Sequence, residues 1–319
     1  MKIVFLETDS LGDDVDLSVF DNLGEVIKYP KSEALKNKER IENADIVVVN
    51  KVPMNEETLK DAHNLKLICI TGTGTNMVDF DYVNKREIKV ANVKGYSTNS
   101  VVQHTFALLF YIYEKMYHYD MFVKNGSYIK SDIFSCFDLK FNELWGKTWG
   151  IIGFGEIGRG VAKIAKAFGC NVIYYSTSGK NNNEEYQRVD FDTLLKESDI
   201  VSIHAPLNKE TENLMEETAF SRMKKTAILL NLGRGPIVNE NALVKALEDE
   251  TIAGAGLDVL RMEPMDVTNP LIRIQDSTKL VITPHIAWAT VEARKRCVLE
   301  VYENMKAYLS GEERNIVKI

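Results

Sequence analysis

The sequence predicts an α/β protein with two domains, each a doubly wound parallel sheet covered by helices on both faces. A chain of 319 residues is longer than one hydrophobic core usually supports. Short, almost continuously apolar segments alternate with helical patterns, and such strands are typical of parallel sheets that are buried on both faces. Residues 198–204 (SDIVSIH) repeat the pattern of residues 44–50 (ADIVVVN), so the two halves of the chain share one architecture.

The first domain is expected to alternate strands and helices up to about residue 98. Its strands are predicted at residues 2–6, 25–28, 44–50, 65–70 and 88–92, and its helices at residues 32–43, 55–64 and 78–85. A glycine-rich segment (TGTGT) at residues 71–75 follows the fourth strand.

The second half begins with a helix at residues 100–115 that has almost no polar face. A helix of this composition is expected to be buried between domains or subunits. Residues 125–142 are aromatic-rich and irregular, and the last helix, residues 290–309, is long enough to pack back on the first domain. The strands of this half are predicted at residues 148–152, 172–175, 198–204, 227–231, 255–260 and 280–283.

A glycine motif opens the second domain. The strand at residues 148–152 leads into GFGEIG, and a helix and another strand follow. Gly153 permits a tight turn, Gly155 lets a pyrophosphate approach the backbone, and Gly158 lets helix and strand pack closely. The helix N-terminus presents free N–H groups and a partial positive charge to phosphates. In this context the motif predicts a dinucleotide site, and we expect two Rossmann-like domains with a cleft between them.

Composition and charge exclude several classes of partner. The net charge of -7 argues against a nucleic-acid groove or an anionic membrane surface. No segment approaches the ~18 apolar residues of a membrane span, and the N-terminal apolar run is a strand and not a signal peptide. Cys69, Cys136, Cys170 and Cys297 lack C-x-x-C spacing. We expect reduced, buried cysteines, no metal site and a cytoplasmic protein.

Three loops after strands of the second domain carry residues suited to catalysis. Arg234 lies between two glycines, Glu263 lies in RMEP, and His285 lies in TPHIAW. Each has a structural explanation alone: a surface ion pair, a solvated turn and a satisfied histidine. Ligands of open α/β sheets, however, bind at the carboxyl ends of the strands. Together the three residues offer a cation, an acid and an imidazole to one substrate.

The order of four motifs resembles the D-isomer-specific 2-hydroxyacid dehydrogenase family over essentially the whole chain. These motifs are GFGEIG, NLGRGPIV, GLDVLRMEP and TPHIAWAT. Residues 95–105 and the HIAW ending resemble the glycerate dehydrogenase (hydroxypyruvate reductase) branch. The resemblance implies a discontinuous, flavodoxin-like substrate-binding domain, residues 1–98 and 289–319, and a dinucleotide-binding Rossmann domain, residues 99–288. It also implies a homodimer, because relatives dimerise through the region of the apolar helix.

The same resemblance assigns roles to the three loop residues. Arg234 is expected to hold the substrate carboxylate and carbonyl, His285 to be the acid/base, and Glu263 to be its partner. The chemistry agrees, because reducing a 2-keto acid requires hydride at C2 and a proton at the developing alkoxide. A histidine exchanges that proton near neutral pH, a carboxylate on its other nitrogen favours the imidazolium, and the arginine fork suits a carboxylate.

Substrate contacts are also predicted in the first domain. Backbone N–H groups of Gly72, Thr73 and Gly74 are suited to bind the substrate carboxylate, and Lys51 either adds charge or is a solvated loop lysine.

The adenosine end of the cofactor site departs from the simplest pattern. The acid that binds the ribose is expected roughly 20 residues after the glycines, and Ser176 stands there. Without that carboxylate, a 2′-phosphate is not repelled, and the neighbouring hydroxyls with Lys180 can bind one, so the cofactor is NAD or NADP. Asp258 either contacts the nicotinamide amide, as the resemblance implies, or caps a turn. The predicted cofactor contacts are Gln103, Gly153, Gly155, Glu156, Ile157, Gly158, Ser176, Thr177, Lys180, His204, Ala205, Pro206, Thr211, Leu232, Gly233, Asp258 and Ala287.

Two other functions are compatible with these residues. Corepressor proteins share this fold and retain the three loop residues, so a non-enzymatic dinucleotide sensor is one alternative. The other is a dehydrogenase for a different 2-hydroxy acid or a formate-type enzyme, because these differ only in the shape of the substrate pocket.

Overall fold

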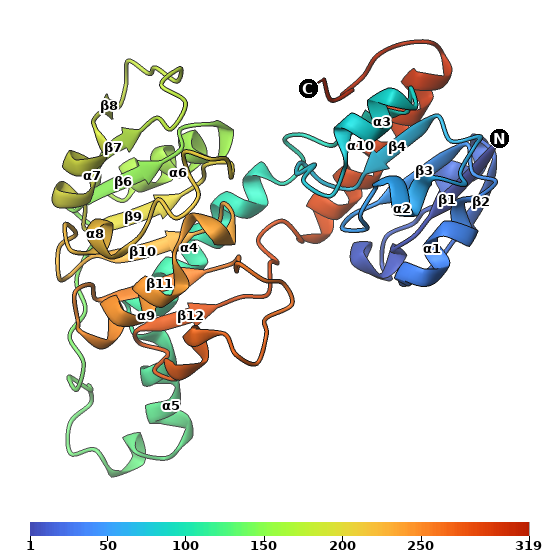
Figure 1. The fold of residues 1–319 in the computed structure, drawn as a ribbon. Coiled ribbons are helices and arrows are strands. Elements are labelled where there is room, and N and C mark those ends of the chain that lie inside the picture. Colours follow the sequence, from blue (N-terminus) through green and yellow to red (C-terminus); the bar gives the residue numbers. More distant parts are fainter. Residues whose placement is uncertain (319) are drawn as a thin grey trace. The chain divides into compact units, whose positions relative to one another are not determined.

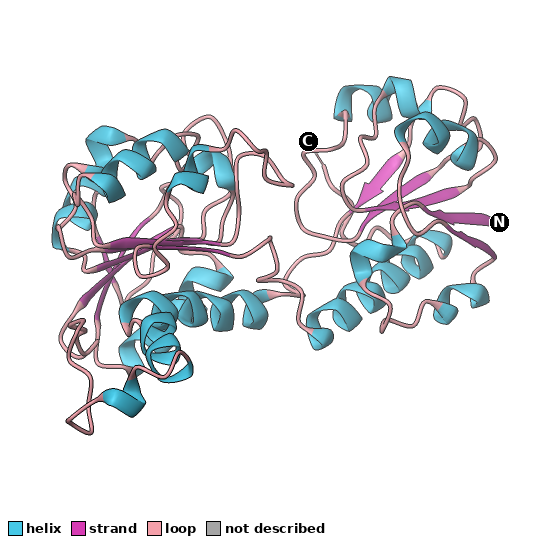
Figure 2. Cartoon of the chain, turned by 90° about the horizontal axis from the view of Figure 1, so that it is seen from below, coloured by secondary structure: helices cyan, strands magenta, loops and turns pink. Residues whose placement is uncertain are grey.

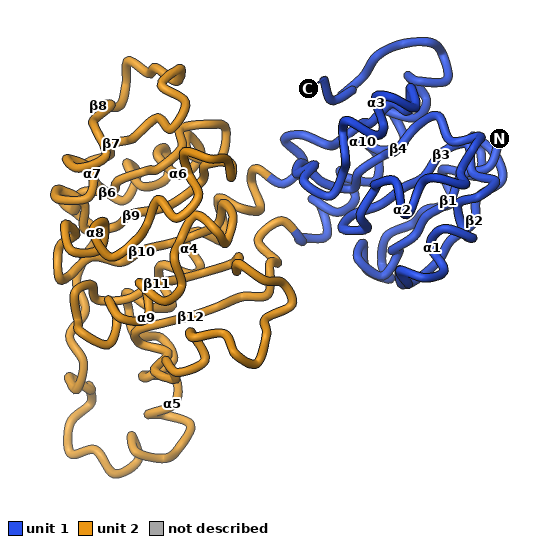
Figure 3. Tube along the Cα trace, viewed as in Figure 1, with its two compact units in different colours: residues 1–97, 289–319 blue, residues 98–288 orange. Residues whose placement is uncertain are grey.

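The computed structural model describes residues 1–318, which form two compact units. Unit 1 comprises residues 1–97 and 289–319, and unit 2 comprises residues 98–288 (Figure 3). The chain therefore leaves unit 1 once and returns to it at the end.

Unit 1 is a five-stranded parallel sheet with the order β2-β1-β3-β4-β5, the order of flavodoxin-like sheets. Its strands are β1 (Lys2–Phe5), β2 (Glu25–Lys28), β3 (Ile46–Val49), β4 (Leu67–Ile70) and β5 (Lys89–Ala91). Its helices are α1 (Ala34–Ile41), α2 (Glu56–Leu59), α3 (Phe80–Lys85) and α10 (Val291–Leu309), with 3-10 turns at Thr8–Leu11 and Ser18–Asn22.

Helix α10 belongs to the core of unit 1, as its length predicts. Thr290 caps its start by accepting a hydrogen bond from the Ala293 amide, and Cys297, Val301 and Met305 are buried along one face. Beyond the helix, the Val317 amide donates to the Val90 carbonyl, 2.8 Å away, so the chain end returns to the edge of the sheet.

Unit 2 is a seven-stranded parallel sheet with the order β12-β11-β10-β9-β6-β7-β8 (Figure 1). The strands are β6 (Thr148–Ile152), β7 (Asn171–Tyr175), β8 (Gln187–Arg188), β9 (Ile200–Ile203), β10 (Ile228–Asn231), β11 (Gly254–Leu257) and β12 (Leu280–Ile282). The helices are α4 (Thr98–Tyr113), α5 (Met116–Lys124), α6 (Glu156–Ala167), α7 (Phe191–Glu197), α8 (Glu217–Phe220) and α9 (Glu240–Glu248), and 3-10 turns lie at Tyr128–Lys130, Gly235–Ile237 and Pro270–Arg273.

Helices cover both faces of each sheet, as the near-continuous apolar strands predict (Figure 2). In unit 2 one buried cluster joins the sheet to α4 and α6, and includes Phe106, Trp149 and Val161. A second cluster joins the other face to α7, α8 and α9, and includes Phe220 and Leu243. The parallel strands consequently present all their carboxyl ends at one edge of the sheet.

Helix α4 is buried, but by the sheet of its own unit. A Cβ atom on Gly256 would lie 3.2 Å from Leu108 Cβ, and one on Gly254 would lie 3.0 Å from Ile112 Cγ2, so two glycines of β11 let α4 approach the sheet closely. The sheet of its own unit therefore covers one face of this helix, and burial between domains or subunits stays a prediction. Its apolar composition reflects a helix packed against a sheet that also carries helices on the other face.

Some local expectations from the sequence need correction. Helix α5 and strand β8 form where no element is predicted, and α2 is much shorter than the predicted helix at residues 55–64. Cys69, Cys170 and Cys297 are buried free thiols, whereas Cys136 is partly exposed. None of the helices in residues 1–318 is both long and apolar enough to cross a membrane.

Candidate active site

The glycine loop lies where the strand order of unit 2 reverses, between β6 and β9, which is where open α/β sheets bind ligands. Gly153 has φ of +90°, and a Cβ there would lie 2.6 Å from the Ala205 amide nitrogen. A Cβ on Gly158 would lie 2.3 Å from the Gly153 carbonyl oxygen. These two glycines are required by the packing of the loop itself.

Gly155 is different, because the fold does not require it. It is the N-cap of α6 with φ of -78°, and no atom lies within 4 Å of the position that a Cβ would occupy. The space in front of this 12-residue helix therefore fits a group that comes close to the backbone, such as a pyrophosphate. This empty space is the structural feature that makes the glycine loop compatible with a bound dinucleotide.

His204 follows β9, and its backbone lies beside the glycine loop, because a Cβ on Gly153 would lie 2.8 Å from its carbonyl carbon. Both ring nitrogens are shielded from solvent and make no hydrogen bond within residues 1–318. Burial lowers the pKa of His204 to about 3, so its imidazole is neutral near pH 7. Ala205 contacts the glycine loop through its backbone, whereas the Thr211 hydroxyl donates to the Pro206 carbonyl at 2.7 Å and so holds the loop in shape.

Ser176 is buried at the end of β7, and its hydroxyl accepts from the Asn181 amide at 3.3 Å. Thr177 is partly exposed and Lys180 is exposed. Arg188 of β8 donates to the Gly179 carbonyl at 3.0 Å and to Asn182 Oδ1 at 3.1 Å, so its guanidinium lies beside the loop that follows Ser176. Sequence analysis missed this arginine because the strand that carries it is only two residues long.

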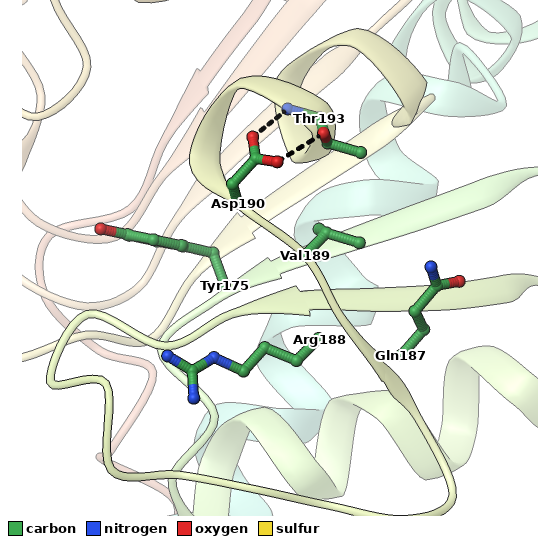
Figure 4. Close-up of a pocket in the computed structure, with 6 residues that line it drawn as sticks. All are labelled: Tyr175, Gln187, Arg188, Val189, Asp190 and Thr193. Atoms are coloured by element: carbon green, nitrogen blue, oxygen red, sulfur yellow. Dashed lines mark hydrogen bonds between the residues drawn. The ribbon is translucent and has the colours of Figure 1, made fainter.

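Tyr175 and Arg188 extend in the same direction from neighbouring strands (Figure 4). They line a pocket that is open to solvent. The Asp190 carboxylate, which also lines this pocket, accepts hydrogen bonds from the Thr193 amide and hydroxyl, both at 2.8 Å. The other lining residues are Gln187 and Val189.

Arg234 lies in a rigid loop after β10. Asn231 holds both ends of the loop, because its side chain accepts from the Gly233 amide at 3.1 Å and donates to the Arg234 carbonyl at 3.0 Å. A Cβ on Gly235 would lie 1.9 Å from the Leu260 carbonyl carbon, so only glycine permits this approach to the loop after β11. The Arg234 side chain is partly exposed and donates to the Gly233 carbonyl at 2.8 Å.

Glu263 and His285 form a close polar pair in the site. His285 Nδ1 lies 2.7 Å from Glu263 Oε2, and Glu263 Oε1 accepts from the Leu260 amide at 3.0 Å. The carboxylate is thus oriented by the same residue that Gly235 contacts. His285 has φ of +53°, and its amide donates to the Asp258 carbonyl at 2.8 Å. A residue other than glycine held in this left-handed conformation is a common feature of functional sites.

Asp258 holds the His285 loop, which supports the turn-capping explanation. Its buried carboxylate accepts from the amides of Ile286 and Ala287, both at 2.9 Å, and from the Thr283 hydroxyl at 2.6 Å. His104 Nε2 of α4 lies 3.0 Å from the same hydroxyl. Although His104 stands beside the predicted contact Gln103, its place in this network was not predicted.

The remaining predicted contacts of unit 2 lie on the same loops. Leu232 and Ala287 are buried, Ile157 is partly buried, and Glu156 and Gln103 are exposed. Contacts with Leu260 and Asp258 connect the loops of the three predicted catalytic residues. The backbone of Ala205 lies against both Gly153 and Gly233, and so connects the glycine loop to the loop that carries Arg234.

The predicted substrate contacts of unit 1 follow β3 and β4. The Lys51 amide donates to Glu7 Oε2 at 2.9 Å, and its side chain is exposed. No atom lies within 4 Å of a Cβ placed on Gly72, while the Thr73 hydroxyl donates to the Val93 carbonyl at 2.7 Å. Gly74 follows the bend at residues 71–73 and is partly exposed.

Sequence and structure comparisons relate this chain to known proteins. Residues 106–287 match the family model described as D-isomer specific 2-hydroxyacid dehydrogenase, NAD binding domain. The chain is 36% identical to a glycerate dehydrogenase of Methylorubrum extorquens over 318 residues, which covers 99% of each chain. This similarity extends across both units.

The chain belongs to the D-isomer specific 2-hydroxyacid dehydrogenase family. A hydroxypyruvate reductase of Blautia hydrogenotrophica is 38% identical over 324 residues, with 99% of each chain covered. The solved structure of an acyclic imino acid reductase in complex with NADPH and D-Arg has a TM-score of 0.88 at 31% identity and covers 100% of both chains. As a member of the 2-hydroxyacid dehydrogenase family, the protein is an NAD(P)-dependent oxidoreductase that acts on CH–OH groups.

Proposed function

We propose that the protein interconverts small 2-keto acids and D-2-hydroxy acids, with hydroxypyruvate to D-glycerate and glyoxylate to glycolate as the favoured reactions. The observation that carries this proposal is the 2.7 Å contact between His285 and Glu263 on loops at the carboxyl edge of the sheet. The names of the glycerate dehydrogenase and hydroxypyruvate reductase relatives support the substrate class.

In the proposed reaction each residue of unit 2 has a separate task. The cofactor, when bound against Gly155 and the start of α6, supplies the hydride that reaches C2 of the keto acid. Arg234 binds the substrate carboxylate and carbonyl through its planar guanidinium. Because Nδ1 of His285 faces Glu263, Nε2 carries the proton that is donated to the developing alkoxide. Glu263 stabilises the protonated imidazole and fixes the orientation of its ring.

Unit 1 is proposed to supply the remaining substrate contacts. The backbone of Gly72, Thr73 and Gly74 binds the substrate carboxylate, and Lys51 adds positive charge. The open space beside Gly72 supports a close approach to this backbone. Unit 1 is accordingly the substrate-binding domain, and unit 2 the dinucleotide-binding domain.

A substrate panel tests the proposed function. Oxidation of NADH or NADPH is followed with hydroxypyruvate, glyoxylate, pyruvate and other 2-keto acids. We expect hydroxypyruvate to have the highest kcat/KM. A different preferred keto acid would assign another dehydrogenase, and tight cofactor binding without turnover of any acid would assign the dinucleotide sensor.

We also propose that the protein uses NADPH as well as NADH. Ser176 stands at the position where a carboxylate would repel a 2′-phosphate. Arg188 and Lys180 provide positive charge near the loop that follows Ser176. We expect Ser176→Asp to shift the ratio of kcat/KM values toward NADH by at least about tenfold, ~1.4 kcal/mol. Arg188→Ala is expected to raise the KM for NADPH and to leave the KM for NADH unchanged. Arg222→Ala, at another exposed arginine of unit 2, is expected to change neither of these two KM values. A wild type that prefers NADH by orders of magnitude contradicts this assignment.

A homodimer is proposed from the exposed apolar residues of α5 and the segment after it. Phe134 is 90% exposed, and Ile129, Phe137 and Trp145 are also strongly exposed. Such a patch is typical of a subunit interface. Sedimentation is expected to give twice the 36.1 kDa of one chain. Phe134→Glu should shift the equilibrium toward monomer, whereas Leu35→Glu, at a side chain of unit 1 that is 93% exposed, should not. A monomeric wild type at micromolar concentration refutes this proposal.

The cellular setting is proposed to be the cytoplasm, without a nucleic-acid or membrane partner. The net charge of -7 and the free thiols of the described residues support a reducing compartment and a small-molecule partner.

A further inference from the structure

Three metal-binding side chains lie together on unit 2, away from the loops of the candidate active site. His118 lies on α5, and Cys136 and Asp138 lie on the irregular segment that follows it. One ligand atom from each residue lies within 4.8 Å of the others. Figures 1 and 2 show α5 projecting from unit 2 beyond the sheet.

The imidazole of His118 lacks a hydrogen bond at this cluster. Its Nε2 atom is shielded from solvent and has no hydrogen-bond partner within residues 1–318, which is unfavourable for a buried polar atom. Its contact with Asp138 Oδ2 is an ion-pair contact of 3.8 Å, too long for a hydrogen bond. Two ligands of one tetrahedral zinc ion, with bonds of ~2.0–2.2 Å, lie about 3.3–3.6 Å apart. The observed separation is close to that arrangement.

Neighbouring contacts hold the two segments in position without a metal. Tyr119, next to His118, donates its hydroxyl to the Leu139 carbonyl at 2.5 Å, and Leu139 is next to Asp138. The Tyr119 ring also packs edge-on against His118 and Phe141, with centroid distances of 5.2 and 5.9 Å. A site whose ligands are already close loses less conformational entropy when the metal binds.

The thiol of the cluster is also the accessible one. Burial raises the pKa of Cys170 to about 11 and of Cys297 to about 12, which disfavours the thiolate that metals require. Cys136 is partly exposed, so a metal ion can reach its sulfur atom.

We propose that His118, Cys136 and Asp138 bind one Zn²⁺ ion. A set of one imidazole, one thiolate and one carboxylate suits zinc and disfavours magnesium and calcium, which prefer oxygen ligands. The protein supplies three ligands, and water completes the tetrahedron. Binding displaces the thiol proton of Cys136 and ties α5 to the segment that carries Phe134 and Phe137. Zinc bound there stabilises this projecting part of unit 2, because it links two segments of the chain.

Metal binding is measured on the full-length protein after removal of metals by a chelator. Titration with Zn²⁺ in competition with a chromophoric chelator gives stoichiometry and affinity, and Co²⁺ reports a thiolate ligand through its charge-transfer absorption. We expect one Zn²⁺ per chain, a higher thermal unfolding temperature with Zn²⁺, and release of a proton on binding.

Matched substitutions separate this site from adventitious binding. His118→Gln, Cys136→Ser and Asp138→Asn are each expected to weaken Zn²⁺ binding by at least about 10–100-fold and to remove the thermal shift. His63→Gln and Asp132→Asn, at exposed residues outside the cluster, should leave both unchanged. Equal affinity in Cys136→Ser, the absence of the cobalt–thiolate band, or no stoichiometric binding by the wild type each overturns the proposal. These readouts do not depend on catalysis, so they are independent of the proposed dehydrogenase activity.

Discussion

His285→Ala loses most of the turnover with hydroxypyruvate, with kcat lowered by about 10²–10⁴-fold, the usual contribution of a general acid. The reason is that no other imidazole takes its place at the carboxyl edge of the unit 2 sheet: His104 bonds to Thr283, and His204 is buried and neutral. The measurement is steady-state reduction of hydroxypyruvate with saturating NADPH or NADH.

Two further variants make this result specific. His63→Ala removes an exposed histidine of unit 1 and is expected to keep wild-type kcat. Arg234→Ala is expected to fail mainly in substrate capture, with a raised KM as well as a lower kcat. The guanidinium is proposed to bind the carboxylate of the ground state and also the carbonyl oxygen, on which negative charge develops in the transition state. If His285→Ala keeps more than about half of the wild-type kcat, then another group donates the proton.

Gly155→Val abolishes binding of the cofactor but leaves the fold intact. The valine side chain meets no atom of the protein, since no atom lies within 4 Å of its Cβ, and the φ of -78° is available to it. Loss of a good N-cap costs about 1 kcal/mol, which does not unfold a domain. The side chain instead occupies the space that a pyrophosphate requires. We expect the affinity for NADH, measured by fluorescence titration, to fall at least about 100-fold, ~2.7 kcal/mol.

Lys163→Val is the matched control for this glycine. It places the same β-branched side chain on the exposed face of the same helix and is expected to keep wild-type affinity for NADH. Gly158→Ala provides a contrast, because a Cβ there would lie 2.3 Å from the Gly153 carbonyl oxygen and is expected to lower the unfolding temperature. Unchanged NADH affinity in a folded Gly155→Val protein contradicts the cofactor site.

The sequence predicted the fold and the strand-end position of the three loops that carry Arg234, Glu263 and His285, because both depend on local patterns. Apolar strands alternating with helices require parallel sheets, and parallel strands place their following loops at one edge. Arg234, Glu263 and His285 each lie in the loop that follows a strand, so their proximity could be inferred without coordinates. The fold class, the family and the enzyme class are confirmed. The individual residue roles stay predictions.

The features that were missed depend on contacts between distant residues. Arg188 reaches the Ser176 loop from a strand of two residues, which leaves no hydrophobic period to detect. His118 and Cys136 are too far apart in the chain for a short metal motif, and only the return of the chain past α5 brings them together. The close packing of α4 on its own sheet was missed for a related reason, since it depends on two glycines of β11.

The most direct test of the account is the pH profile of reductive kcat/KM for Glu263→Gln beside wild type. In the proposed reaction His285 donates a proton to the substrate, and its Nδ1 atom lies 2.7 Å from the Glu263 carboxylate. Glutamine keeps the shape and a hydrogen-bonding group but removes the charge. For reduction, the account predicts that the fall of kcat/KM at alkaline pH moves to lower pH in Glu263→Gln. For oxidation it predicts the opposite pH dependence, so the rise of activity with pH also begins at lower pH in this variant. Superimposable profiles would contradict it and reduce Glu263 to a turn residue.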